Sequence, residues 1–214
     1  MTPPIRVVIA DDHEVVRVGL ETLLGSVAPH IEVVGHAGSV LEMTQTTRKR
    51  RPDVLLADVQ MDENALDALD MLRGEFPSLG IVVLTHFDNP TYIARALIYK
   101  VNAYLFKGVS GPELVQAIEA AARGEQWFHV PEVARIRQLL LATRKKPEDA
   151  DIPLSHREMQ VLRHVALGLS NMDIARSLNI TVDTVKEHVQ SILRKLQVSD
   201  RTQAAVWAIR RGVI

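Results

Sequence analysis

The sequence of 214 residues contains no cysteine. Without cysteine the chain can form no disulfide bond, no thiolate metal site and no cysteine nucleophile, and this composition fits a reducing compartment. Its apolar runs stop well short of the roughly 20 residues that span a bilayer, and Met1–Arg6 shows no cationic segment followed by an apolar core. The sequence therefore predicts a cytoplasmic protein that does not enter a membrane.

The net charge of −1 hides an uneven distribution of charge along the chain. Residues 1–123 hold 11 Lys and Arg against 16 Asp and Glu, which gives a net charge of −5. Residues 153–214 hold 9 against 5, a net charge of +4, and the segment between them is balanced. Because polyanions bind concentrated positive charge, this division predicts two domains, of which the second binds nucleic acid.

Residues 1–123 alternate short apolar runs with longer amphipathic stretches. This alternation predicts an α/β domain, a five-stranded parallel sheet with helices on both faces. The expected strands are Ile5–Ala10, Ile31–Val34, Val54–Ala57, Ile81–Leu84 and Ala103–Phe106. The expected helices are about His13–Ser26, Val40–Arg50, Leu66–Glu75, Pro90–Lys100 and Gly111–Arg123.

Polar residues follow these strands at the end where parallel sheets bind ligands. They are Asp11, Asp12, Asp58, Thr85 and Lys107. Three carboxylates at one edge repel each other unless a cation intervenes, and an all-oxygen site suits Mg²⁺. Asp58 is then a candidate nucleophile that forms an aspartyl phosphate, with Lys107 and Thr85 binding the phosphoryl oxygens. Taken singly, each residue has an ordinary structural explanation as a cap, a turn residue or a solvated charge.

The rest of the chain has only helical apolar spacing. Residues 124–152 read as a linker with one helix, Pro131–Arg144, and residues 153–214 as an all-α domain of four short helices. Ser155 and Glu158 have capping-box spacing for the first of these helices. Asn171 is the expected cap of the second helix.

A tight turn at Asn179 separates the second helix from the third, which Thr181 caps. The fourth helix, Thr202–Arg211, is capped by Ser199 or Asp200 and stopped by Gly212. On the third helix the apolar stripe is Val185, Val189, Ile192 and Leu196, and the opposite polar stripe is Asp183, Glu187, Gln190 and Arg194.

A short helix, a tight turn and a longer helix with a free polar face predict a helix-turn-helix unit whose recognition helix enters a major groove. The alternative is a generic helical bundle with a solvated polar face. The apolar positions of the fourth helix, Ala205, Val206 and Ile209, are either a dimer surface or part of the domain core.

The acidic residues resemble those of bacterial response-regulator receiver domains, which have a flavodoxin-like fold. The resemblance implies that Asp58 is the phosphoacceptor, and that Asp11, Asp12, Asp58 and the Gln60 carbonyl bind Mg²⁺. It also implies that Thr85 is a switch hydroxyl that moves together with Tyr104. An ordinary aromatic filler on the last strand is the alternative for Tyr104.

Some positions depart from the receiver pattern. The usual Met-Pro-Gly loop is replaced by Met61–Ala65, which includes the acidic Asp62 and Glu63, and His86 is bulkier than the residue that usually follows the switch hydroxyl. Added negative charge beside Asp58 disfavours an incoming phosphoryl group. We therefore expect an atypical receiver, in which phosphorylation is slow, weakly coupled or dispensable.

The second domain resembles the LuxR-type DNA-binding domain in its motifs Leu154-Ser155-x-Arg157-Glu158, Gly168–Asn171, Thr184-Val185-Lys186-x-His188 and Arg201–Ala205. Together the two domains resemble a NarL/FixJ-type two-component response regulator, a phosphoprotein that acts in phosphorelay signal transduction. By position, Lys186, Glu187 and Gln190 are expected on base edges, and Thr184, Arg194 and Lys195 on phosphates. An alternative for Glu187 is an ion pair with Arg194.

The resemblance implies a transcription regulator that is no enzyme, binds double-stranded DNA as a homodimer and takes its signal from a sensor histidine kinase. Two other functions stay open. One is a Mg²⁺-dependent aspartyl-phosphate phosphatase in which Asp62 is the second carboxylate. The other is a protein-interaction module whose receiver binds a partner without phosphate.

Overall fold

The computed structural model describes residues 3–62, 64–86, 88–143 and 154–213. These residues form two compact units. One comprises the chain up to Asp88 together with Tyr99–Val133, and the other comprises Asn89–Ile98 and the chain from Ala134 onward. None of the helices in the described part of the chain combines the length and the apolar character that a membrane span requires.

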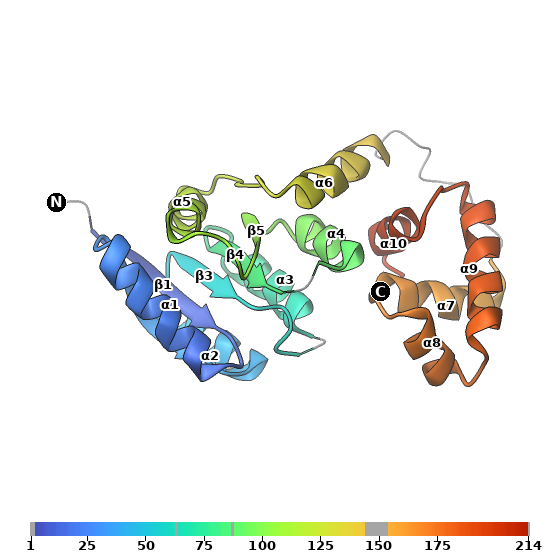
Figure 1. Ribbon diagram of the computed structural model, residues 1–214, viewed down its shortest axis with the longest axis horizontal. Coiled ribbons are helices and arrows are strands. Elements are labelled where there is room, and N and C mark those ends of the chain that lie inside the picture. The colour runs from blue at the N-terminus through green and yellow to red at the C-terminus, as the bar shows by residue number, and fades with distance from the viewer. Residues whose placement is uncertain (1–2, 63, 87, 144–153, 214) are drawn as a thin grey trace. The chain divides into compact units, whose positions relative to one another are not determined.

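The first unit is built on a five-stranded parallel sheet in the order β2-β1-β3-β4-β5 (Figure 1). The order reverses between β1 and β3, so the carboxyl ends of these two neighbouring strands are a topological switch point where ligands bind in open α/β sheets. The strands are β1 (Ile5–Ala10), β2 (Ile31–Ala37), β3 (Val54–Ala57), β4 (Gly80–Thr85) and β5 (Ala103–Phe106).

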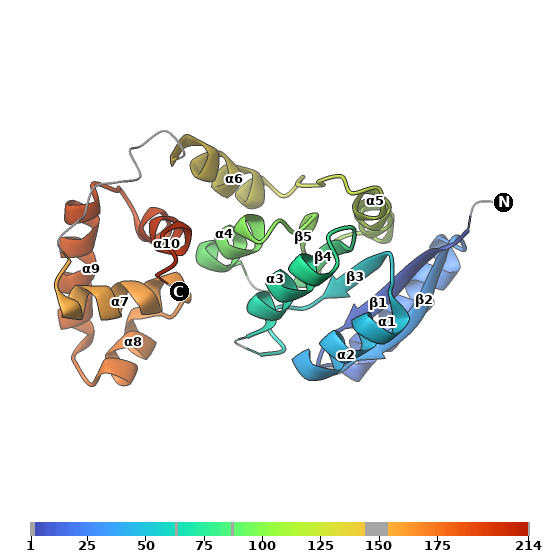
Figure 2. The ribbon, with the colours of Figure 1, turned by 180° about the vertical axis from the view of Figure 1, so that it is seen from behind.

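Helices cover both faces of this sheet, as the two opposite views show (Figures 1 and 2). Helices α1 (Glu14–Val27) and α5 (Gly111–Ala122) pack together on one face, and α2 (Val40–Arg50) and α3 (Ala65–Glu75) pack together on the other. Alternate apolar side chains of the strands point into the layer under α1 and α5, where Ile9, Leu56 and Leu105 are nearly inaccessible to solvent. The predicted doubly covered α/β sheet is thereby confirmed.

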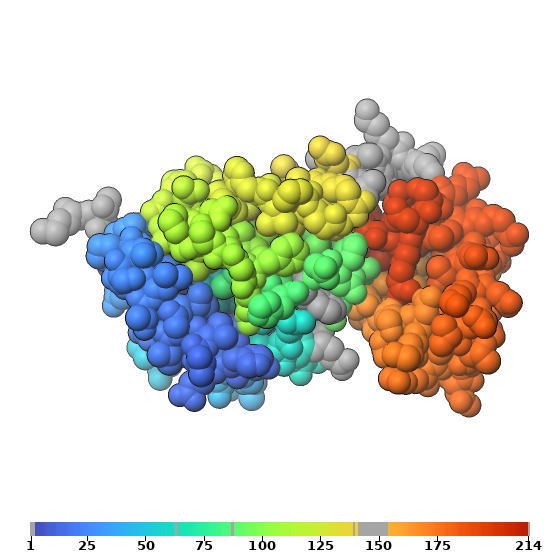
Figure 3. Space-filling view, in the orientation of Figure 1, coloured from blue at the N-terminus to red at the C-terminus, as the bar shows by residue number. Residues whose placement is uncertain are grey.

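The second unit is helical. Its last four helices form one closely packed body, coloured orange to red in Figure 3, around a core that includes Val161, Ile174, Val185, Ile192 and Ala208. Its helices are α4 (Pro90–Ile98), most of α6 (Pro131–Thr143), α7 (His156–Ala166), α8 (Asn171–Leu178), α9 (Val182–Leu196) and α10 (Arg201–Arg210).

The predicted element boundaries hold to within a few residues, and the largest differences are at β2 and α4. Strand β2 continues to Ala37, three residues beyond the predicted end, because His36 and Ala37 pair with the end of β1. Helix α4 ends at Ile98, and Lys100 has a left-handed φ of 58° that breaks the helical path. Arg144, the predicted end of the linker helix, lies outside the described residues.

Three of the predicted helix caps and the predicted turn in the last domain are present, and the prediction for one cap was wrong. The cap of α8 is Ser170, whose hydroxyl accepts a hydrogen bond from the Asp173 N–H, whereas Asn171 is the first residue of the helix. The capping box at the start of α7, the Thr181 cap of α9, the left-handed turn at Asn179 and an Asp200 cap of α10 are all observed. The described domain therefore has the helix-turn-helix geometry that the sequence predicted.

Candidate functional site

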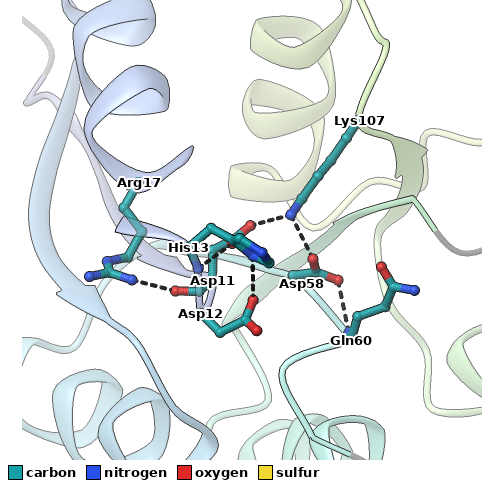
Figure 4. Close-up of polar contacts among 7 residues, drawn as sticks. All are labelled: Asp11, Asp12, His13, Arg17, Asp58, Gln60 and Lys107. Atoms are coloured by element: carbon teal, nitrogen blue, oxygen red, sulfur yellow. Dashed lines mark hydrogen bonds and ion pairs between the residues drawn. The ribbon is translucent and has the colours of Figure 1, made fainter. Parts of the chain in front are cut away.

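The acidic pocket lies where β1, β3 and β5 end. The Lys107 ammonium lies between two carboxylates, with Nζ 2.5 Å from Asp11 Oδ2 and 2.6 Å from Asp58 Oδ2 (Figure 4). The side chains of Asp11 and Asp58 are almost fully buried. Asp58 Oδ1 also accepts a hydrogen bond of 2.8 Å from the Gln60 N–H, so the carboxylate has a fixed orientation.

The charge of Lys107 is stabilised in this pocket. Burial lowers the pKa of its ammonium group, but hydrogen bonds and charges from Asp11 and Asp58 outweigh burial and leave the pKa above its usual value. The ammonium therefore stays protonated at physiological pH. It supplies a positive charge next to Asp58, where negative charge would build up if a phosphoryl group arrived.

Sequence reasoning missed two residues that shape this pocket. Arg17 donates a 2.6 Å hydrogen bond to the carbonyl oxygen of Asp11, and the His13 N–H donates one of 2.9 Å to Asp11 Oδ1. The ring of His13 also lies beside Asp12, with Nδ1 2.7 Å from Asp12 Oδ1. Arg17 lies on α1 and His13 directly before it. Their positions did not indicate a role in the pocket, since residues of these types occur at the start of many helices that bind no ligand.

Ligand atoms of Asp11, Asp12 and His13 lie within 4.8 Å of one another, so the pocket can hold a metal ion. Asp58 lies next to this group, joined to it through Lys107. Clustered carboxylate oxygens are the ligands that Mg²⁺ prefers, and an exposed carboxylate such as Asp12 leaves room for the waters that this ion retains. The residues present therefore fit the predicted cation.

Thr85 and Tyr104, the predicted switch pair, are both completely buried in the first unit. Thr85 ends β4, and Tyr104 is the second residue of the neighbouring strand β5. The Tyr104 ring meets Phe106 edge to face, with ring centroids 6.0 Å apart. Complete burial fits an ordinary aromatic filler as well as a switch residue, so the coupled movement of Thr85 and Tyr104 stays a prediction.

The atypical loop after β3 holds Asp62 in a local hydrogen-bonded turn. Asp62 is exposed, and its Oδ1 accepts hydrogen bonds of 2.8 Å from both the backbone N–H and the side-chain amide of Asn64. Its carboxylate therefore fixes the turn into α3. His86 is exposed as well, and Glu63 lies outside the described residues. The repulsion that the charge of Asp62 exerts on an incoming phosphoryl group stays a prediction, and so does a narrowing of the pocket by the bulk of His86.

The recognition helix of the second unit is α9. Its apolar stripe is packed inward, with Val185, Ile192 and Leu196 buried against α7 and α8. On the opposite side Lys186, Glu187, Gln190 and Arg194 are exposed. A hollow of about 320 Å³ lies on this side, lined by Glu187, Gln190, Ser191 and Arg194.

The exposed side chains of α9 differ in how firmly they are held. Lys186 forms an ion pair of 3.0 Å with Asp183, one helical turn earlier, and both side chains are largely exposed. Thr184 is tied to the helix start by its hydroxyl, 2.9 Å from that of Thr181. Among the described residues no ion pair joins Glu187 to Arg194, so this alternative is not supported.

Lys195 is placed differently from the other predicted DNA contacts. Its Nζ lies 2.7 Å from Oε2 of Glu158, which is on α7, and the side chain of Lys195 is only one-third exposed. The same carboxylate accepts hydrogen bonds from the Ser191 hydroxyl at 2.7 Å and from the Ser155 N–H at 2.6 Å. Glu158 therefore joins the start of α7 to the second half of α9.

This network predicts a defined acid sensitivity. Burial raises the pKa of Glu158, but hydrogen bonds from Lys195, Ser155 and Ser191 outweigh it and lower the pKa from 4.5 to about 2. Because the folded pKa is depressed, the stabilising contribution is complete above pH 4.5 and is lost as the pH falls toward 2.

The test compares the free energy of unfolding of the wild type and of Glu158→Gln at several pH values, with Trp207 of α10 as the fluorescence probe in a Trp127→Phe background. The difference should be constant above pH 5 and shrink progressively between pH 4.5 and pH 2. A difference that does not change with pH would mean that the Glu158 charge contributes nothing.

The structure assigns the apolar side chains of α10 to the core. Ala205 and Ile209 pack with residues of α7 and α9, and Val206 is 1% exposed. The alternative of a plain domain core, left open by the sequence, thus accounts for these three residues. A dimer surface on this helix would have to use its other positions.

Comparisons with known proteins agree with both domains. The family model of the response regulator receiver domain matches residues 7–119, and that of bacterial regulatory proteins of the luxR family matches residues 152–208. Response regulator protein VraR of Staphylococcus aureus (strain NCTC 8325 / PS 47) is 35% identical over 211 residues, which cover 98% of this chain and 99% of VraR.

Two solved structures are similar over nearly the whole chain. One contains two RcsB dimers bound to two parallel DNAs, with a TM-score of 0.62, 25% identity, and coverage of 96% of this chain and 98% of that one. The other is RcsB from Salmonella enterica serovar Typhimurium bound to a promoter in the presence of phosphomimetic BeF3−. Its TM-score is 0.63 at 26% identity, and the match covers 95% of this chain and 97% of that one. The chain belongs to the response regulators that combine a receiver domain with a LuxR-type helix-turn-helix domain.

Proposed function

We propose that this response regulator binds double-stranded DNA as a homodimer through α9 and regulates transcription. The main observation behind the proposal is that α9 has one polar side exposed to solvent, while its other side is packed in the core of the domain. Relatives of the same architecture are DNA-bound, and one of them is described as dimers on DNA. The positive charge of residues 153–214 supplies the attraction to phosphates.

On the exposed side of α9, position and side-chain chemistry separate the residues expected to contact bases from those expected to contact phosphates. Gln190 has the amide that pairs with adenine, Lys186 suits guanine, and Glu187 can accept a hydrogen bond from cytosine. Arg194 lines the hollow from the last turn of α9 and Thr184 lies near the helix start, and both suit phosphate contacts. The ammonium of Lys195 is engaged by Glu158, and we assign it a different role below.

This separation of base contacts from phosphate contacts predicts different effects for substitutions at two residues one helical turn apart. Gln190→Ala should change the preferred base at one position of the site and cost roughly 1–3 kcal/mol there. Arg194→Met should weaken binding to all sequences alike and reduce the slope of log K against log salt by roughly 0.9. Selection from random duplexes and salt titrations measure both. The assignment fails if both variants lower affinity uniformly.

In the receiver, Asp58 is proposed as the acceptor of a phosphoryl group from a sensor histidine kinase. A carboxylate oxygen of Asp58 attacks phosphorus, the bond from phosphorus to the donor nitrogen breaks, and the donor imidazole leaves with the electron pair. Lys107 balances charge on the phosphoryl oxygens, and Thr85 donates a hydrogen bond to one of them. Mg²⁺ held by Asp11, Asp12, Asp58 and the Gln60 carbonyl would neutralise further negative charge.

Asp62 is proposed to slow this transfer through its charge alone. Because its carboxylate is exposed and bonded to Asn64, its effect on an incoming phosphoryl group is a screened repulsion. The same contacts weaken the phosphatase alternative, since Asp62 is engaged in the turn into α3 and has no described contact with Asp58. We therefore propose a regulator and no enzyme.

A further inference from the structure

The carboxylate of Glu158 connects two separate parts of the DNA-binding domain, the start of α7 and the second half of α9. Its side chain is 6% exposed, and it accepts from the backbone of Ser155, from the hydroxyl of Ser191 and from the ammonium of Lys195. Ser155 and Glu158 belong to the capping box of α7, whereas Ser191 and Lys195 are one turn apart on α9. A buried carboxylate with three donors has a narrowly defined position.

Ser191 links this network directly to the surface proposed to read DNA. It lines the hollow on the exposed side of α9 together with Glu187, Gln190 and Arg194, while its hydroxyl is held by Glu158 Oε1. The rotation of α9 about its axis therefore determines where Gln190 and Arg194 point, and Glu158 restrains that rotation from the buried side. A base-reading side chain must be placed to within about half an ångström to make a good hydrogen bond.

Lys195 and Arg194 are neighbouring cations with opposite surroundings. Arg194 is exposed and has no side-chain partner among the described residues, which suits a phosphate contact. Lys195 is two-thirds buried and bound to a carboxylate, so reaching a phosphate would require the ion pair to break and leave Glu158 without its cation. Breaking a buried pair in this way is costly.

We propose that Lys195 is a positioning residue, which together with Glu158 and Ser191 sets the orientation of the recognition helix and makes no contact with a DNA phosphate. This inference rests on the proposed function, because it concerns how α9 presents Gln190 and Arg194 to DNA. It reassigns a residue whose position in the sequence predicts a phosphate contact.

Salt dependence separates the two roles, since a phosphate contact releases counterions and a positioning contact does not. The full-length wild type, Lys195→Met and the matched control Arg194→Met are titrated with the duplex selected by the wild type and with a random-sequence duplex. Arg194→Met should reduce the slope of log K against log salt by roughly 0.9, and Lys195→Met should leave it unchanged. Lys195→Met should nevertheless lower affinity for the selected duplex about tenfold and reduce the preference at the base pair read by Gln190.

Two further variants separate the loss of the Glu158 network from the loss of a positive charge. Lys195→Arg should restore both affinity and preference, because a guanidinium can also pair with Glu158, and Ser191→Ala should reduce the preference while leaving every cation in place. Trp207 fluorescence, in a Trp127→Phe background, checks that each variant is folded at the temperature used. If Lys195→Met does not fold, Ser191→Ala alone tests the network, and an unchanged base preference would then overturn the proposal.

Different results would overturn this inference and the proposed function. A slope reduced as much by Lys195→Met as by Arg194→Met would show that Lys195 contacts phosphate and would overturn the positioning role. A wild type that binds the selected duplex no better than a random one would instead overturn the proposed function. A loss of affinity equal for all sequences, with the slope unchanged, would reduce Lys195 to a residue that only stabilises the fold.

Discussion

Replacing Asp58 with asparagine should abolish stable labelling of the protein by radioactive acetyl phosphate. The amide lacks a nucleophilic oxygen anion, and no other described carboxylate pairs with Lys107 except Asp11, whose Oδ1 is occupied by the His13 N–H. The wild type should be labelled with Mg²⁺ present, and the label should be labile to hydroxylamine, as an acyl phosphate is. Labelling of Asp58→Asn at the wild-type level would show that another residue is the acceptor.

The matched variant Asp62→Asn tests the charge of the atypical loop. It keeps an oxygen that can accept from Asn64 and removes the negative charge, so the turn into α3 is retained. We expect Asp62→Asn to be labelled faster than the wild type and to reach the same final level. Equal rates would mean that the charge of Asp62 does not limit phosphorylation, and rapid wild-type labelling with a matching gain in DNA affinity would make this an ordinary phosphorylation switch.

Replacing Arg201 with methionine should destabilise the DNA-binding domain by about 3 kcal/mol, because two partly buried acceptors lose a charged donor. Arg201 opens α10, and its guanidinium donates to the carbonyl of Leu169 and, at 2.7 Å, to Oδ1 of Asn171. Burial lowers the pKa of this guanidinium. The side chain therefore connects α10 to the segment that leads into α8 of the helix-turn-helix unit.

Urea unfolding followed by Trp207 fluorescence measures this change in the Trp127→Phe background. Asn171→Ala is the control, because it removes one of the two acceptors and leaves the bond to Leu169, and should cost only about 1 kcal/mol. If Arg201→Met costs no more than Asn171→Ala, the bond to the Leu169 carbonyl contributes little to stability.

The features that sequence predicts well are local ones. The runs Ile5–Ala10, Val54–Ala57 and Ala103–Phe106 are strands with the predicted bounds, since a strand buried on both faces is apolar along nearly its whole length, and only the partly buried Arg6 departs from this. The Thr181 cap and the Asn179 turn depend on backbone chemistry within a few residues. The convergence of Asp11, Asp58 and Lys107 was also predictable, because carboxyl ends of parallel strands meet at one edge.

The features that sequence did not predict join distant positions. Glu158 is identifiable as part of a capping box, but its pairing with Lys195, 37 residues later, depends on how α7 and α9 cross. Arg201 has its acceptors about 30 residues earlier, and no pattern of spacing indicates them. The apolar positions of α10 fit a dimer surface and a core equally well in sequence, and only packing decides between them.

The most direct test of the account is selection of DNA by the intact protein from random duplexes, with and without acetyl phosphate and Mg²⁺. The account predicts enrichment of an inverted repeat whose affinity falls steeply with salt, with at most a weak gain from acetyl phosphate that Asp58→Asn lacks. Enrichment of no sequence under either condition, by a protein whose tryptophan fluorescence shows it to be folded, would contradict the account.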